Sequence, residues 1–345
     1  MERIREMDHE GLGQIELIDL SAFLKESLPR EYPDLNARQI EDLIRNNSAA
    51  LLIIRKGVDI LLGRGVADAM LQQQDELPYD TKGNAMGRIV NKVARHTIVF
   101  GPKEFARKSR IQEDEKGKQR FVNTIVGFDT ERIPLLTELR NRLHELFPLR
   151  EKGSKGDVVL MAEGNHYYDL SVAQHTKTYI VWHGDTERKI VICARIGRGR
   201  GRSQPLAYQW YDQTGRLIGQ PIKVFIRHGD IYVMSEKATG WDWKKKSKDL
   251  YLHLEHAAGE AVVDSPTNRS EKRVAARGKR KSRTGKSETR DEECSMFMSQ
   301  NLSDLESFNV KGDPEYRRLS NKCVCEPFRR SDAEPTTQKR LNPLT

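Results

Sequence analysis

The chain has 345 residues, a formal net charge of +9 and four cysteines, and no apolar run reaches the roughly 18 residues that a membrane span needs. These features argue against a disulfide-stapled secreted domain, and we expect a soluble intracellular protein with no membrane and no disulfide-linked partner. The basic balance favours anionic partners, nucleic acid first, and we expect a monomer. A hydrophobic share of 37% beside a charged share of 32% indicates that disordered residues dilute an ordinary core.

Three regions follow one another along the chain. Residues 1–48 predict a polar N-terminal segment that contains a helix capped by Asn36. Residues 49–259 predict the folded domain, and residues 260–345 a basic disordered tail. Within the tail, the basic clusters at 272–273 and 277–283 have the spacing of a bipartite nuclear-import signal. We therefore predict a nuclear location, with the cytoplasm as the alternative.

The folded domain begins with a predicted hairpin around Lys56 and Gly57, between apolar runs at 50–54 and 58–62. The charge-rich stretch 103–120 predicts a loop, and leucines at helical spacing in 134–147 predict an amphipathic helix. From residue 158 onward, short apolar runs alternate with Gly and Asp turns, which is typical of a sandwich, jelly roll or barrel. The fold class predicted is mainly β with flanking helices (α+β).

The stretch 179–193 carries the main chemical signal. Two apolar, β-branched runs flank a short polar centre, the pattern of two buried strands that meet at a turn. His183 and Asp185 stand one residue apart in that centre, so in an extended chain both side chains project to the same face. A histidine and a carboxylate at a strand end are two of the three ligands of the facial triad that binds non-haem Fe(II).

Further motifs accompany this pair: Asn-His-Tyr at 165–167, His-Gly-Asp-Thr-Glu-Arg at 183–188, Met-Ser-Glu-Lys-Ala-Thr-Gly at 234–240 and Leu-Glu-His-Ala-Ala-Gly at 254–259. In this order they resemble the AlkB-like family of 2-oxoglutarate- and Fe(II)-dependent dioxygenases, in particular a branch from protists and large viruses. The resemblance covers about residues 49–259. It implies a double-stranded β-helix (jelly-roll) core and the oxidative demethylation of alkylated nucleic acid. It also implies that His183 and Asp185 bind Fe(II), while Asn165 and Tyr167 contact 2-oxoglutarate.

The third metal ligand has to be found outside the usual Trp-x-His pattern, because residues 241–246 contain no histidine. The last strand offers His253 and His256, which are three residues apart and therefore face opposite sides of a sheet. His256 shares the face of the neighbouring leucines, and the branch keeps a histidine at this position. The predicted ligands are thus His183, Asp185 and His256, with a core histidine as the alternative role for His256.

The cation that would hold the far carboxylate of 2-oxoglutarate also departs from the family. The residue before His256 is Glu255 rather than arginine, and a glutamate here is expected to repel that carboxylate. Arg195 is in phase with Cys193 on the strand that leaves the metal turn, and we predict that it takes over this role. The alternatives are Arg227 and Lys237.

Nucleic-acid contacts are predicted at an arginine-glycine run and at a basic segment further upstream, since flexible or amphipathic basic stretches follow phosphates. The residues are Arg198, Arg200, Arg202, Arg88 and Lys92. Tyr208, Trp210 and Tyr211 beyond the run are more simply strand residues of the core. Two other functions stay open at this point: a catalytically inactive relative that binds nucleic acid, and a protein hydroxylase or demethylase of the same fold.

Overall fold

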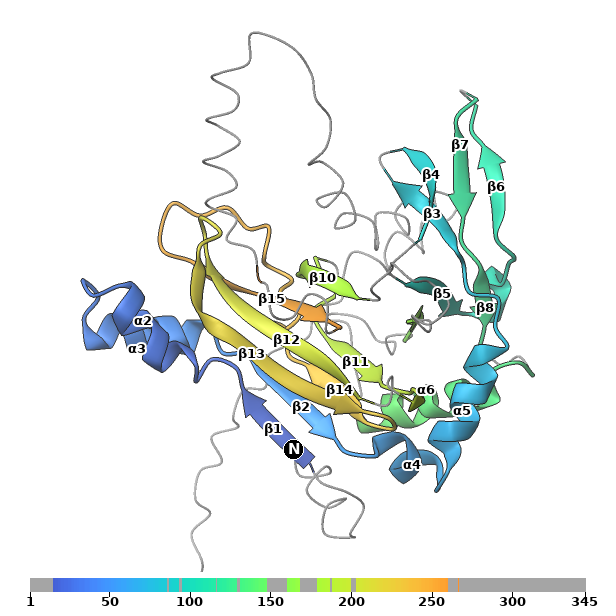
Figure 1. Ribbon diagram of the computed structural model, residues 1–345, viewed down its shortest axis with the longest axis horizontal. Coiled ribbons are helices and arrows are strands. Elements are labelled where there is room, and N and C mark those ends of the chain that lie inside the picture. The colour runs from blue at the N-terminus through green and yellow to red at the C-terminus, as the bar shows by residue number, and fades with distance from the viewer. Residues whose placement is uncertain are drawn as a thin grey trace, which may run out of the picture.

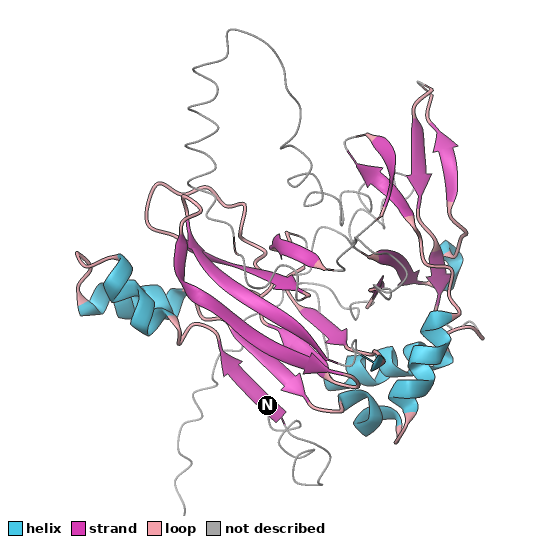
Figure 2. Ribbon diagram, in the orientation of Figure 1, coloured by secondary structure: helices cyan, strands magenta, loops and turns pink. Residues whose placement is uncertain are grey.

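The computed structural model describes residues 15–259 and residue 266, except 86, 93–94, 116, 129–130, 148–159, 168–178, 187 and 200–202. The predicted tail lies outside the described residues apart from Pro266. The described part of the chain is mainly β, with helices on two opposite sides of the molecule (Figures 1 and 2), so this part of the predicted fold class is confirmed. None of the described helices is long and apolar enough to cross a membrane. Cys193 is the single cysteine in this part of the chain, and its thiol is free.

Two four-stranded antiparallel sheets form the centre of the molecule (Figure 1). The first has the order β1 (Ile15–Asp19), β2 (Ala50–Ile54), β14 (Ile231–Met234), β11 (Val191–Ala194). The second has the order β10 (Ile180–His183), β15 (Leu252–Ala258), β12 (Ser203–Asp212), β13 (Leu217–Arg227). Strands β12 and β13 form one long hairpin, longer than the predicted strands at 206–211 and 221–226.

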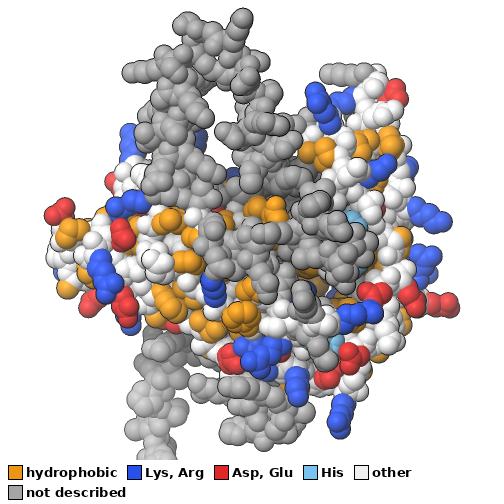
Figure 3. Space-filling view, viewed as in Figure 1, with side chains coloured by type: hydrophobic (Ala, Val, Ile, Leu, Met, Phe, Trp, Pro, Cys, Tyr) orange, Lys and Arg blue, Asp and Glu red, His pale blue; other side chains and the backbone are white. Residues whose placement is uncertain are grey.

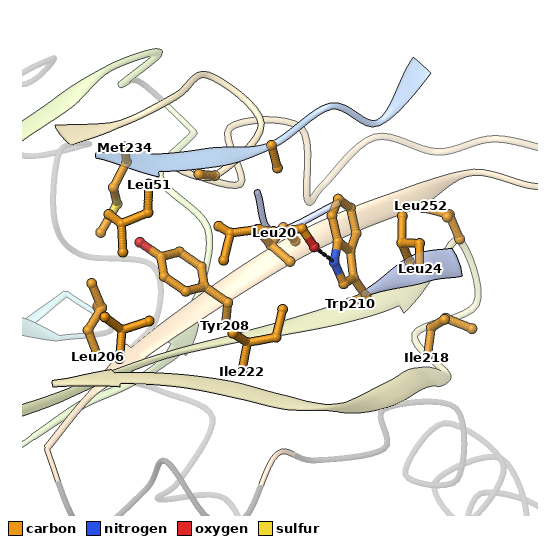
Figure 4. Close-up of a cluster of buried hydrophobic side chains, with 14 of the residues drawn as sticks. Leu20, Leu24, Leu51, Leu206, Tyr208, Trp210, Ile218, Ile222, Met234 and Leu252 are labelled. Carbon is orange, nitrogen blue, oxygen red and sulfur yellow. Dashed lines mark hydrogen bonds between the residues drawn. The ribbon is translucent and has the colours of Figure 1, made fainter. Parts of the chain in front are cut away.

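The main core lies between these two sheets. Alternate residues of each strand point inward, so Leu51 and Met234 of the first sheet meet Leu206 and Tyr208 of the second (Figure 4). Trp210 packs in the same layer, and its indole Nε1 donates a hydrogen bond to the carbonyl of Leu20 at 3.0 Å. The aromatic residues of β12 are therefore core residues, as the sequence predicts.

Residues 15–48 share this core. Strand β1 pairs along its whole length with β2, and α2 (Leu24–Glu31) buries Leu24 and Leu28 in the same cluster. The predicted cap is confirmed: α3 (Ala37–Asn46) begins after Asn36, whose side chain accepts from the Gln39 amide while the Gln39 side chain accepts from the Asn36 amide. The segment set apart by its sequence thus packs on the residues that follow it.

The hairpin predicted around Lys56 and Gly57 is wrong, because a helix, α4 (Gly57–Leu62), follows β2. Lys56 adopts a left-handed conformation, and its amide donates to the Asp230 carboxylate. The Val58 amide donates to the Gly229 carbonyl. These contacts turn the chain away from the sheet, and the apolar run that would have been a strand packs against α5 (Val66–Asp75) and α6 (Pro134–Leu146). Helix α6 confirms the predicted amphipathic helix, with Leu139 and Leu143 buried.

A second group of strands stands beside the sandwich (Figure 1). Its central sheet has the order β8 (Ile125–Gly127), β5 (His96–Gly101), β9 (Ala162–His166). Two hairpins extend from it: β3 (Lys82–Ala85) with β4 (Arg88–Asn91), and β6 (Arg110–Glu113) with β7 (Gln119–Val122). The loop predicted over 103–120 is therefore wrong: this stretch holds a 3-10 turn, η1 (Lys103–Phe105), and strand β6, and reaches β7, whose polar side chains hid the pairing.

Candidate metal centre

Three side chains predicted as metal ligands come together at one end of the sandwich. Ligand atoms of His183, Asp185 and His256 all lie within 4.8 Å of one another. His183 on β10 is the direct partner of His256 on β15, and their rings are 4.3 Å apart. Nε2 of His183 lies 3.6 Å from Oδ1 of Asp185. The rival histidine, His253, is not part of this group.

The turn that carries these ligands joins two sheets rather than two paired strands. Strand β10 pairs with β15 in the second sheet, whereas β11 pairs with β14 in the first. The chain therefore crosses the sandwich between His183 and Val191, and Asp185 lies in the crossing. This differs from the simple turn that the sequence predicts, and it places the ligands where the two sheets meet at their ends.

The protonation states of the three side chains suit a cationic metal. Nδ1 of His183 lies 2.7 Å from the Val181 carbonyl, so Nδ1 is the donor of this hydrogen bond and Nε2 is the ring nitrogen that faces Asp185. Burial lowers the pKa of His256 to about 3, so its imidazole is neutral. Burial would raise the pKa of Asp185, but the nearby positive charges, that of Arg188 first, outweigh it and lower that pKa. Two imidazoles and one carboxylate are the donor set of the facial triad.

Two glycines allow the metal turn to sit this close to the neighbouring chain. A Cβ on Gly184 would lie 2.2 Å from the Gly240 carbonyl oxygen, and a Cβ on Gly240 would lie 2.2 Å from that of Leu254. Gly240 also has a φ of +67°, which favours glycine. The Asp185 amide donates to the Thr239 carbonyl at 2.8 Å. Three of the motifs noted in the sequence thus meet at this point.

Glu255 does not face the ligands. Along β15 the side chains alternate, and Tyr208 lies opposite His256 while Gln209 lies opposite Glu255. His253 is on the Glu255 face, where its ring stacks on Tyr211 and its Nε2 lies 3.4 Å from Glu255. The expectation that Glu255 repels a carboxylate at the metal is therefore wrong, because the sheet separates the two.

The predicted co-substrate residues lie around the same end of the sandwich. Asn165 accepts a hydrogen bond from Nε of Arg95, and the guanidinium of Arg195 lies 5.7 Å from the centre of the Tyr167 ring. Burial raises the pKa of Tyr167 to about 12, so its hydroxyl stays protonated.

The two alternative cations are engaged or positioned elsewhere. Lys237 donates to Asp242 and to the Leu252 carbonyl. Arg227 is exposed at the end of β13, where its charge lowers the pKa of Glu16. Among the three candidates, Arg195 is the one that the structure brings beside Tyr167.

Three charged residues at the site are missing from the sequence prediction. Arg188 reaches Asp185 at 3.9 Å with Nη1 and Glu163 at 2.7 Å with Nη2, so it ties the metal turn to β9. Arg95 lies close enough to lower the pKa of Asp185. Arg188 belongs to a quoted motif, and Glu163 stands two residues before Asn165 on one face of a strand. Nothing in the sequence around Arg95 distinguishes it from an arginine on a solvated surface.

The residues predicted to contact nucleic acid differ in their exposure and in their side-chain partners. Arg88 is exposed on β4. Lys92 donates to the hydroxyl of Thr97, and Arg198 pairs with Asp75 of α5. Arg200 and Arg202 lie outside the described residues. Basic and acidic side chains are interspersed over the face seen in Figure 3, without a single-sign patch on the described surface in that view.

Comparison with known proteins places the chain beside a viral relative. A scan against protein-family models finds no match. The chain is 33% identical over 261 residues to "Uncharacterized protein R156" of Acanthamoeba polyphaga mimivirus, which covers 75% of this chain and 89% of that protein. Identity at this level over most of both chains reflects a shared fold and ancestry. The chain belongs to the same family as this mimivirus protein.

Proposed function

We propose that the protein is a 2-oxoglutarate- and Fe(II)-dependent dioxygenase of the AlkB-like type that demethylates alkylated nucleic acid. The observation that carries the proposal is the meeting of His183 and Asp185 with His256 on the neighbouring strand. The fold brings these three residues together although His183 and His256 are far apart in the sequence. Gly184 and Gly240 allow the close approach, because a Cβ at either position would clash with the neighbouring backbone.

The donor set fits Fe(II). Three protein ligands on one side leave three positions for a chelating 2-oxo acid and O2. When bound, Fe(II) and 2-oxoglutarate supply the oxidation of a C–H bond, and an N-methyl group oxidised in this way is lost as formaldehyde. The chain's part is to hold the ligands, position both substrates and limit the access of water: His183 and Asp185 have only 13% and 9% of their side-chain surfaces exposed.

The strand order supports a double-stranded β-helix. Such a fold needs the strand with His-x-Asp to pair with the strand of the distal histidine, and the next strand to lie in the opposite sheet. Strand β10 pairs with β15, and β11 joins β14 across the sandwich. The metal ligands then lie at the end of the sandwich where the chain crosses from one sheet to the other.

The orientation of Glu255 favours an active enzyme over an inactive relative. An inactive relative is suggested by the glutamate beside His256 and by the departure from the usual third ligand, but the Glu255 side chain lies on the other face of β15. Tyr167 and Arg195 supply a hydroxyl and a guanidinium near the site instead.

A nucleic-acid substrate and a nuclear location are supported by the basic composition and by the basic clusters of the tail. If the target is a base in a duplex, its nucleotide has to leave the stack, which costs a few kcal/mol. Arg88 is exposed on the β3–β4 hairpin, and in this proposal it contacts the backbone of such a strand.

The test has two stages. Anaerobic calorimetry with Fe(II) and 2-oxoglutarate should show binding by the wild type and a loss of Fe(II) binding in His183→Ala. Formaldehyde release is then compared between N-methylated DNA, N-methylated RNA and a methylated peptide, with His183→Ala as the blank. Release from oligonucleotides supports the proposal. Release from the peptide alone would assign the protein to the hydroxylases and demethylases of proteins, and no binding of either component would reject an enzyme.

A further inference from the structure

Tyr208 is a buried tyrosine with an unused hydroxyl. It lies in the middle of β12 with none of its surface exposed, and its side chain points between the two sheets (Figure 4). Among the described residues its hydroxyl has no hydrogen-bond partner. Its ring is 6.2 Å from that of His256, its direct partner on β15.

Two other polar side chains of this layer have protein partners. Trp210, two residues along on the same face, donates to the Leu20 carbonyl. Tyr232, across the sandwich on β14, donates its hydroxyl to the Cys193 sulfur. A buried hydroxyl without a partner is costly, and such groups in native proteins mark a bound ligand or water. Beside the metal ligands two buried polar atoms, the Tyr208 hydroxyl and Nδ1 of His256, have no hydrogen-bond partner among the described residues.

The position of this hydroxyl is close to the metal ligands and to the strand of Arg195. Burial, with a smaller contribution from the charge of Asp185, raises the pKa of Tyr208 well above its ordinary value, so the hydroxyl keeps its proton and can donate. Cys193 is two residues before Arg195 on β11 and faces the same interior. A ligand that extends from the metal into the sandwich would pass between β11 and β12.

We propose that the Tyr208 hydroxyl donates a hydrogen bond to the far carboxylate of the 2-oxo acid, beside Arg195, and that it makes the site prefer a 2-oxo diacid over a 2-oxo monoacid. The residues that bind this carboxylate then come from β12 and from the end of β11, and not from β15. The inference rests on the proposed function, since it assigns a residue to the co-substrate of that reaction.

The test uses the full chain loaded with Mn(II) and measures the binding of 2-oxoglutarate and of 2-oxobutyrate, which lacks the far carboxylate. Tyr208→Phe should weaken 2-oxoglutarate about 10-fold, the effect of one hydrogen bond to a charged group. The affinities for Mn(II) and for 2-oxobutyrate should not change. The Tm of the metal-free variant should be equal to or above that of the wild type, because no internal hydrogen bond is lost.

Tyr211→Phe is the matched control, since it removes a buried hydroxyl from the opposite face of the same strand. It should leave the affinity for both acids unchanged. The inference is overturned if Tyr208→Phe binds 2-oxoglutarate as the wild type does, or if it loses both acids equally together with a lower Tm, which would indicate a structural role. A wild type that binds neither acid would instead overturn the proposed function, so the two failures are distinguishable.

Discussion

His183 and His256 face each other across two antiparallel strands, and their rings are 4.3 Å apart at 53°. The residues are 73 positions apart in the chain, and strand register alone brings them together. A slip of one residue along β15 would turn His256 to the face of Glu255. The metal centre therefore depends on the features that fix this register, among which the contacts of Gly184 and Gly240 are the closest to the ligands.

Replacing Gly240 by alanine should destabilise the protein strongly. Its left-handed φ costs a residue with a Cβ about 1–2 kcal/mol, and the new Cβ would also lie 2.2 Å from the Leu254 carbonyl oxygen. We expect urea denaturation to show a loss of roughly 3 kcal/mol in the free energy of unfolding. The folded fraction of the variant should bind Fe(II) more weakly than the wild type.

Gly65→Ala is the control for this prediction. Gly65 also has a positive φ, of +82°, but nothing lies within 4 Å of the position of its Cβ. Its replacement should cost only about 1 kcal/mol and leave metal affinity unchanged. Equal losses in the two variants would show that the close approach to β15 is unimportant.

Arg195→Met should reduce the affinity of the metal-loaded protein for 2-oxoglutarate by about 10- to 100-fold, as expected for a lost hydrogen bond between charged groups. Arg227→Met, on the exposed end of β13, should have no effect. Calorimetry of both variants distinguishes the candidate cations. The assignment of Arg195 does not survive if the two variants bind the co-substrate equally well.

The stability of the sandwich edge should depend on acid pH through Glu16. A hydrogen bond from Arg55 lowers the pKa of Glu16 below its ordinary value of 4.5. The contribution of this carboxylate is therefore complete above pH 4.5 and is lost as the pH falls through the lowered value. Glu16→Gln should reduce the free energy of unfolding by a constant amount at neutral pH, and the gap to the wild type should narrow below pH 4.5. A gap that stays constant down to pH 3 would contradict this account.

Arg88→Ala should weaken nucleic-acid binding uniformly across sequences. The slope of log K against log salt should fall by about one, since one phosphate contact is lost. Arg45, exposed on α3 and paired with Asp42, is a suitable control at the other end of the molecule (Figure 1). An unchanged slope in Arg88→Ala, measured by fluorescence anisotropy at several salt concentrations, would exclude the β3–β4 hairpin from the interface.

The sequence predicts the parts of this structure that depend on local spacing. The period of two separates His256 from His253 along β15, and the Asn36 cap and the leucines of α6 are equally local signals. These follow from the geometry of a single strand or helix, so a sequence is sufficient to find them.

The errors arise where a distant segment decides the local structure. The turn after Lys56 becomes a helix because Gly229 and Asp230 accept its amides, and nothing near residue 56 indicates those partners. Strands β6 and β7 bury little apolar surface, so their pairing left no hydrophobic pattern. The role predicted for Glu255 is wrong because its side chain points to the face of β15 opposite to that of His256. Tyr208 could not be told from an ordinary core tyrosine, since an unused hydroxyl becomes visible only once its neighbours are placed.

The most direct test of the central claim is an anaerobic titration of Fe(II) into the wild type, His256→Ala and His253→Ala in the presence of 2-oxoglutarate. Both histidines are buried on the same strand, so the pair controls for the general effect of removing a buried imidazole. We expect the wild type and His253→Ala to bind Fe(II) with the same affinity and stoichiometry, and His256→Ala to bind none. Binding that persists in His256→Ala, or that is lost only in His253→Ala, would contradict the metal centre described above.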